Sequence, residues 1–168
     1  WDKNPYFEHA EVQYFLAVKD GVDVGRISAQ VDTLIQEKWG PNLGHFGLFE
    51  ASDGDVAHAL FEAAKEWLKE RGMTRMEGPW SLSSNEECGL LVDGFNYPPV
   101  VMMPHALPDH KTYFENEGFE KAKDLYAYTR DSSTHIPERM QRIVQITARN
   151  KRTRIREIDM KKFKAELD

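Results

Sequence analysis

The chain is poor in cysteine. Cys88 is the single cysteine in 168 residues, which excludes an internal disulfide framework and leaves no Cys-x-x-Cys pair. Because the sequence shows no histidine partner for Cys88, we interpret it as a structural residue rather than a nucleophile. The lack of disulfides fits a reducing compartment, and we expect the protein in the cytoplasm.

Long hydrophobic runs and an excess of positive charge are also missing. No apolar stretch approaches the length of a membrane span or of a signal-peptide core. The formal net charge of −6 argues against general nucleic-acid binding. A length of 168 residues suits one domain with a real core. The chain begins with Trp1 rather than Met, so we expect a piece of a longer protein.

The first part of the chain predicts a β-hairpin. Residues Gln13–Val18 are apolar and β-prone, Asp20-Gly21 is a typical hairpin turn, and Val24–Asp32 returns as the second strand. Gly25, inside that second strand, indicates a bulge or a close backbone contact.

A strand–helix–strand unit follows the hairpin. Gly44–Glu50 is predicted as a strand, and apolar residues then recur at helical spacing from Val56 to Trp67. Gly72 stands where a glycine that ends a helix belongs. Thr74–Trp80 is the next predicted strand, and a helical crossover of this length makes the two strands parallel neighbours.

A second helix is predicted to end at Gly118, because only a residue without Cβ enters the left-handed conformation cheaply. Tyr113, Phe114 and Phe119 surround this glycine and are expected to anchor the corner in the core. The segment Glu120–Arg130 is predicted as a strand directly after it.

A long insertion, Ser81–Pro108, lies between the predicted strand Thr74–Trp80 and the second predicted helix. Ordered loops of this length are often binding elements. In that interpretation His105 lies at the rim of a site. Alternatively, Val100–Met103 is a buried strand and the loop only covers one face of the sheet. The candidate substrate-binding residues of the insertion are Asn85, Glu86 and Tyr97.

The order hairpin, strand, helix, strand, helix, strand resembles that of the GNAT (N-acetyltransferase) superfamily, as does the aromatic-x-x-x-Gly-Phe corner at 114–119. The runs 86–95 and 98–104 resemble a group of long bacterial proteins with two GNAT-like halves. The resemblance implies an α/β (α+β) fold. It would be a mixed, twisted sheet with an antiparallel hairpin and a βαβ unit, with helices on both faces.

The resemblance also implies a function, transfer of an acetyl or other acyl group from acetyl-CoA (acyl-CoA) to an amine. Glu50, at the end of its strand, is the candidate general base; His45 in the same strand we interpret as structural. Tyr113 is the candidate acid, because Phe114 carries no proton at the position where these enzymes often have a tyrosine. The candidate cofactor-binding residues are Phe49, Ser52, Asp53, Gly54, Asp55 and Phe114. No metal is expected.

The loop Ala51–Asp55 leaves a second function class open. Asp53 and Asp55 would repel a diphosphate at the helix N-terminus, and glycines are few. Alternatively, Ser52 or Asp53 simply caps the helix. We therefore expect weak acetyl-CoA binding by this chain alone. The second class is a non-catalytic GNAT-like half that binds a ligand or packs against a catalytic half.

The domain prediction divides the chain into three parts. Residues 1–131 form a GNAT-like domain that lacks its own first strand and helix, and 132–150 form a linker helix. Residues 151–168 form a strand (Arg154–Asp159) and a helix (Lys161–Leu167), which either open a second GNAT-like half or complete the first sheet. The basic run at 149–156 reads as a solvated linker rather than a nucleic-acid site. Expected partners are a small-molecule or peptide amine, and a second GNAT-like half or a homodimer, but no membrane.

Overall fold

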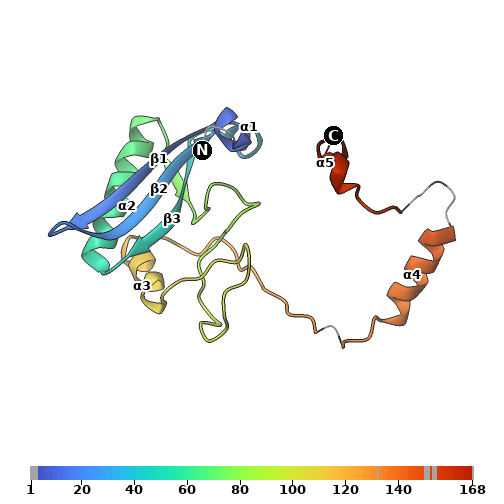
Figure 1. The fold of residues 1–168 in the computed structure, drawn as a ribbon. Helices are drawn as coiled ribbons and strands as arrows, with labels where there is room; N and C mark the ends of the chain where they lie inside the picture. Colours follow the sequence, from blue (N-terminus) through green and yellow to red (C-terminus); the bar gives the residue numbers. More distant parts are fainter. Residues whose placement is uncertain (1–3, 132, 150–151, 153–154, 168) are drawn as a thin grey trace. The chain divides into compact units, whose positions relative to one another are not determined.

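The computed structural model describes residues 4–131, 133–149, 152 and 155–167. They belong to two units, Trp1–Leu125 and Tyr126–Asp168, which are treated separately. The first unit is a mixed α/β domain with one four-stranded sheet in the order β1-β2-β3-β4 (Figure 1). This confirms the predicted fold class. Every buried side chain among the described residues lies between Tyr6 and Phe114, so the core belongs to this unit.

The predicted hairpin is formed by β1 (Ala10–Lys19) and β2 (Val22–Asp32), which pair antiparallel. The turn residues Asp20 and Gly21 have φ angles of 52° and 78°, as the Asp-Gly signal predicts for a two-residue turn. The register shifts after Ala17, opposite Gly25, so the expected bulge is present. A Cβ on Gly25 would also collide with Val56 and Leu60 of the helix behind it.

The predicted βαβ unit is also present. It comprises β3 (Leu43–Ala51), α2 (Gly54–Glu70) and β4 (Arg75–Glu77), and β3 pairs parallel with β4. The predicted fourth strand was too long, because β4 ends at Glu77 and the chain leaves the sheet at Gly78. From there the amide of Trp80 donates to the carbonyl of Phe46 at 2.7 Å.

One face of the sheet packs against α2, which lies behind the strands in Figure 1. The contact is dominated by aromatic rings whose centroids lie about 5 Å apart, mostly edge-on or tilted. These rings are Phe46, Phe49, Phe61, Phe114 and Phe119. Removing such a ring costs about 3–5 kcal/mol in a typical core, so this cluster holds helix, sheet and the 114–119 corner together.

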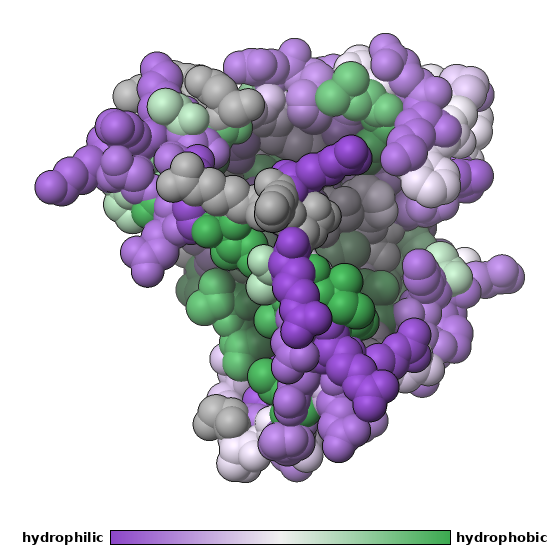
Figure 2. Space-filling view, turned by 90° about the vertical axis from the view of Figure 1, so that its right-hand side faces the viewer, coloured by the Kyte–Doolittle hydropathy of each residue, from purple (hydrophilic) through white to green (hydrophobic). Residues whose placement is uncertain are grey.

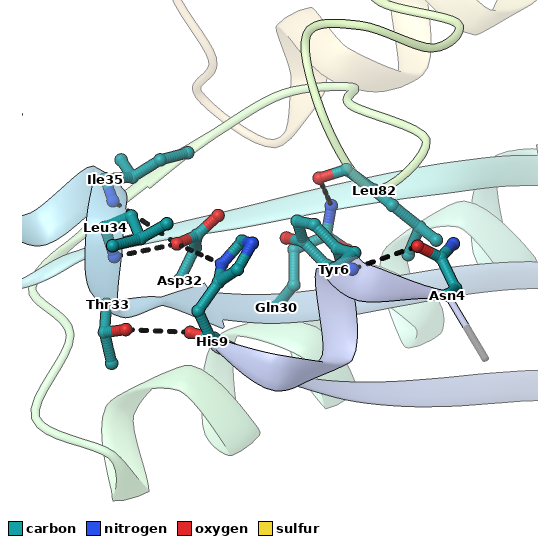
Figure 3. Close-up of polar contacts among 9 residues, drawn as sticks. All are labelled: Asn4, Tyr6, His9, Gln30, Asp32, Thr33, Leu34, Ile35 and Leu82. Carbon is teal, nitrogen blue, oxygen red and sulfur yellow. Dashed lines mark hydrogen bonds and ion pairs between the residues drawn. The ribbon is translucent and has the colours of Figure 1, made fainter. Parts of the chain in front are cut away.

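The opposite face of β2 and β3 is covered, in the described residues, by an irregular segment where we expected a helix. The side-chain amide of Gln30 donates to the carbonyls of Trp80 (2.7 Å) and Leu82 (3.4 Å), and Figure 3 shows Gln30 directed at the Leu82 carbonyl. The rings of His45 and Trp80 stack at 4.4 Å. A Cβ on Gly47 would overlap the Trp80 carbonyl. The chain therefore crosses the sheet here because Gly47 leaves room for it.

A short helix, α1 (Thr33–Trp39), was not predicted. Asp32 caps it by accepting hydrogen bonds from the amides of Leu34 (2.9 Å) and Ile35 (3.3 Å). The same carboxylate lies 3.0 Å from Nδ1 of His9, next to the 3-10 helix η1 (Pro5–Glu8), as Figure 3 shows. The Asp-Thr pair was a capping signal that the sequence contained.

The second helix of this unit is α3 (Pro108–Asn116), and it ends as predicted. Gly118 has a φ of 79°. The amide of Phe119 donates to the Phe114 carbonyl and that of Gly118 to the Glu115 carbonyl, both at 3.1 Å, which is the pattern of a Schellman C-cap.

Two strand predictions after β4 were wrong. Glu120–Arg130 forms no ladder with any described strand, and Val100–Met103 is not a buried strand, since Val101 is 92% exposed. A strand requires a partner. The edge of the sheet ends at the three-residue β4, where the chain turns away, so β-prone residues further along find no neighbour.

The second unit contains α4 (Glu138–Arg149), η2 (Met160–Lys162) and α5 (Phe163–Leu167). Within the predicted linker helix at 132–150, the structure shows a helix over 138–149; residues 133–137 are not helical, and Ser132 and Asn150 lie outside the described residues. The elements η2 and α5 confirm the predicted helix at the end of the chain. The predicted strand at 154–159 is absent over 155–159, and Arg154 lies outside the described residues. None of the helices described here is long and apolar enough to cross a membrane.

Apolar side chains are exposed on both units. On β1 they alternate as Tyr14, Leu16 and Val18, and on α4 they include Met140, Ile143 and Val144. Figure 2 shows hydrophobic side chains interspersed with hydrophilic ones on one side of the molecule. Met140, Ile143 and Val144 share one face of α4, and no residue of this helix is buried.

Candidate functional site

Glu50 lies where β3 loses its regular geometry. Leu48 has a φ of 49°, and the register between β2 and β3 shifts between Arg26 and Ser28. This bulge, opposite the position where the chain leaves β4, turns the end of β3. The Glu50 side chain remains 49% exposed. The bulge thus presents a carboxylate at an edge of β3 that has no described strand partner.

Two cavities meet at Glu50. An open groove of about 480 Å³ is bordered by the ends of β2 and β3, including Leu16 and Ser52. A smaller cavity of about 60 Å³ lies between the β3 bulge, the insertion and α3. Arg26 and Glu50 line both. A large molecule in the groove would therefore reach the smaller cavity beside the Glu50 carboxylate.

Tyr113 and Phe114, adjacent on α3, have different surroundings. Phe114 is buried in the aromatic cluster and lines the small cavity, as does Phe49. Tyr113 does not line it. Its ring lies 5.9 Å from that of His110 and within 4 Å of the position that a Cβ on Gly54 would take. The structure therefore places Tyr113 at the start of α2 rather than beside Glu50.

The loop before α2 serves as a helix cap. Asp53 is the N-cap of α2, and its carboxylate accepts a hydrogen bond from the Val56 amide at 2.9 Å. This bond lowers the pKa of Asp53. Asp55 lies in the first turn, and the Ser52 hydroxyl donates to the Asp53 carboxylate at 3.3 Å. The capping alternative is confirmed, and the anion-binding end of α2 carries negative charge.

The insertion contributes other residues to the cavity than those predicted from the sequence. Asn85, Glu86 and Tyr97 line neither cavity beside Glu50. The Glu86 carboxylate accepts a bond from the Ser83 amide at 3.2 Å, and Tyr97 is 71% exposed. The insertion residues that line the small cavity are Ser81, Glu87, Gly89, Leu90, Pro104, His105 and Ala106, and Pro79 before the insertion lines it too. Only His105, placed at the rim of a site, was singled out beforehand.

Three polar groups outside this site have structural explanations. Burial lowers the pKa of His45 to about 4, in keeping with its interpretation as a structural residue, and burial raises the pKa of Cys88. The carboxylate of Glu117 lies close to His58 and Glu62, a triad with the spacing of metal ligands. However, the Lys65 ammonium lies 2.6 Å from Glu117 and 3.0 Å from Glu62. The two carboxylates of the triad are thus already paired with a cation.

The ion pair also shifts the titration of Glu117. Burial alone would raise its pKa, but hydrogen bonds from Lys65 and His58 outweigh burial, and the pKa is lowered. The cluster therefore fastens the end of α3 to α2 and is not part of the candidate site.

The chain is similar to two curated bacterial proteins. It is 46% identical over 166 residues to a protein of Caulobacter vibrioides named bacterial ceramide synthase, covering 98% of this chain and 43% of that protein. It is 41% identical over 168 residues to protein YghO of Escherichia coli, covering 98% of this chain and 42% of that protein. The chain thus spans less than half the length of these relatives. No family model and no solved structure matches it significantly.

Proposed function

We propose that this chain is part of an enzyme that transfers a fatty acyl group from an acyl thioester such as acyl-CoA to the amine of a long-chain amino alcohol. A ceramide is an amide of exactly these two components, and one similar protein is named ceramide synthase. The observation in the structure that supports this proposal best is the Glu50 carboxylate at the junction of a groove and a small cavity, beside an unpaired edge of β3.

The geometry suits acyl transfer to nitrogen in two respects. An ammonium must lose a proton before it attacks a thioester, and a half-exposed carboxylate at the reaction site can accept the proton directly or stabilise a neighbouring group that accepts it. The β3 edge beyond Gly47, past the hydrogen bond from Trp80 to Phe46, has no described strand partner, so an extended pantetheine arm can lie there in the manner of a strand. Both features are expected of a member of the GNAT superfamily, to which we assign the chain as part of this proposal.

A second candidate function is a non-catalytic GNAT-like half that packs against a catalytic one. The acidic start of α2 favours it, because Asp53 and Asp55 oppose a diphosphate there. Under this proposal Glu50 has no role in turnover.

The two candidates are separated by amide formation in the full-length protein, measured with palmitoyl-CoA and sphinganine and, in parallel, with acetyl-CoA. For an active half, Glu50→Gln should lower kcat by roughly two to four orders of magnitude and leave acyl-CoA affinity nearly unchanged. Glu66→Gln is the matched control, since Glu66 is exposed on α2 outside both cavities. Unchanged turnover in Glu50→Gln would exclude a role for Glu50 in the reaction. Amide formation with acetyl-CoA but not with palmitoyl-CoA would exclude a fatty acyl donor.

A further inference from the structure

His110, in the first turn of α3, has an unusual environment for an imidazole. It is 1% exposed, and its ring packs against those of Phe49 (5.3 Å) and Tyr113 (5.9 Å). Its Nε2 atom is buried without a hydrogen-bond partner among the described residues. Leaving such an atom unpaired is unfavourable, because it has lost its hydrogen bonds to water. Buried polar atoms without a partner are rare, so this one calls for an explanation.

The nearest acid suggests one. Nε2 of His110 lies 3.9 Å from Oε2 of Glu50, too far for a hydrogen bond. Both side chains line the small cavity. The two acceptors are therefore separated but belong to side chains that line the same cavity, as expected if a third group donates to both. An ammonium has three N–H donors and no acceptor.

We propose that His110 and Glu50 together form the site that binds and deprotonates the acceptor amine. This rests on the proposed function. The ammonium donates one hydrogen bond to the Glu50 carboxylate and one to Nε2 of His110, and Nε2 takes the proton. The neutral amine attacks the thioester carbonyl carbon, so that a C–N bond forms and the C–S bond breaks. The amine's second proton passes to the leaving thiolate, and His110 releases its proton to solvent.

The two residues have distinct parts in this step. The Glu50 carboxylate draws the cation to the cavity and stabilises the imidazolium that forms. The neutral imidazole, shielded from solvent by Phe49 and Tyr113, is the group that becomes protonated. The other charged or titratable side chains that line the cavity are Arg26, Glu87 and His105.

Three variants test the pair in the full-length protein. His110→Gln retains a polar group of similar reach, and His110→Phe fits the surrounding rings but has no acceptor. We expect kcat/KM to fall by roughly 10²–10⁴-fold in His110→Phe. In both His110 variants we expect the acidic limb of the pH profile of kcat/KM to change. His135→Gln is the control, because His135 is exposed and lines neither cavity. An unchanged pH profile in both His110 variants would overturn the proposal.

A second measurement does not depend on turnover. The imidazole ¹⁵N chemical shifts of His110, assigned from the signals lost in His110→Gln, should move when dodecylamine is added below its micellar concentration. The shifts of His58 should not, and in Glu50→Gln the response of His110 should weaken. If the ¹⁵N chemical shifts of His110 do not change when dodecylamine is added, the proposed amine site of His110 and Glu50 is refuted, even if the enzyme is active. Conversely, absence of amide formation with a normal His110 response would refute the proposed function and leave the amine site standing.

Discussion

At the scale of single residues, buried imidazoles are the most informative groups in this chain. His45 and His110 are both about 1% exposed, and both have ring nitrogens without a partner among the described residues. His45 stacks on Trp80 outside both cavities, whereas His110 lines the small cavity beside Glu50. Burial alone therefore does not distinguish a structural histidine from a functional one. The distinction comes from the surroundings of the unpaired ring nitrogen.

His45 makes the free energy of unfolding depend on pH. Its pKa is lowered from 6.5 to about 4 by burial, so the folded state binds fewer protons than the unfolded state between these values. The stabilising contribution is complete above the unfolded pKa and is lost as pH falls toward the folded one. We expect the free energy of unfolding to fall by about 2 kcal/mol between pH 7 and pH 5 from this residue.

Urea unfolding of His45→Phe at both pH values checks this prediction. The phenyl ring preserves the stack on Trp80 and breaks no hydrogen bond, so the variant should be at least as stable at pH 7 and lose less stability at pH 5. A variant that loses as much stability as the wild type on acidification would show that other groups are responsible.

At the scale of elements, the start of α2 shows how one feature serves stability at the expense of binding. Asp53 satisfies the Val56 amide as N-cap, yet it brings a negative charge to the helix end where a diphosphate would bind. Asp55 adds a second charge in the first turn. The sequence raised both interpretations, and the structure shows that capping is real.

The charge at this helix end can be removed without removing the cap. Asn at position 53 still accepts a hydrogen bond, so Asp53→Asn combined with Asp55→Asn should raise acetyl-CoA affinity about tenfold at low ionic strength and less at high salt. Isothermal titration of this chain measures it, with Asp109→Asn at the start of α3 as control. Submicromolar binding by the unmodified chain would contradict the expected weak binding.

At the scale of the whole molecule, core and charge are unevenly distributed. The segment Tyr126–Asp168 holds half of the 22 Lys and Arg residues but only 6 of the 28 Asp and Glu residues. All side chains buried among the described residues belong to Trp1–Leu125. The first unit is thus acidic and carries the core, and the second is basic with exposed apolar residues.

This distribution predicts that the first unit folds by itself. A chain that ends at Leu125 should unfold cooperatively in urea with a midpoint close to that of the 168-residue chain, because every described buried side chain is retained. Circular dichroism during a urea titration measures both. A chain ending at Leu125 that is unfolded, or that unfolds at a much lower midpoint, would show that residues 126–168 stabilise the domain.

Local elements with strong chemical signals could be predicted from the sequence. Asp20-Gly21 fixed the hairpin, the apolar spacing from Val56 to Trp67 fixed α2, and Gly118 fixed the end of α3. The turn residues and helix caps act within a few positions along the chain, and a helix satisfies its backbone within itself. Glu50 could be singled out because it is the last residue of a predicted strand.

The tertiary structure alone decided which residues meet. β-prone segments such as Glu120–Arg130 did not become strands because a strand depends on a partner far along the chain, and β4 ends after Glu77. The same departure from the sheet, permitted by Gly47, laid the insertion across β3 and set which of its residues reach the cavity. His110 lies sixty residues from Glu50, and only the packing of α3 against the β3 bulge brings the two side chains within 3.9 Å.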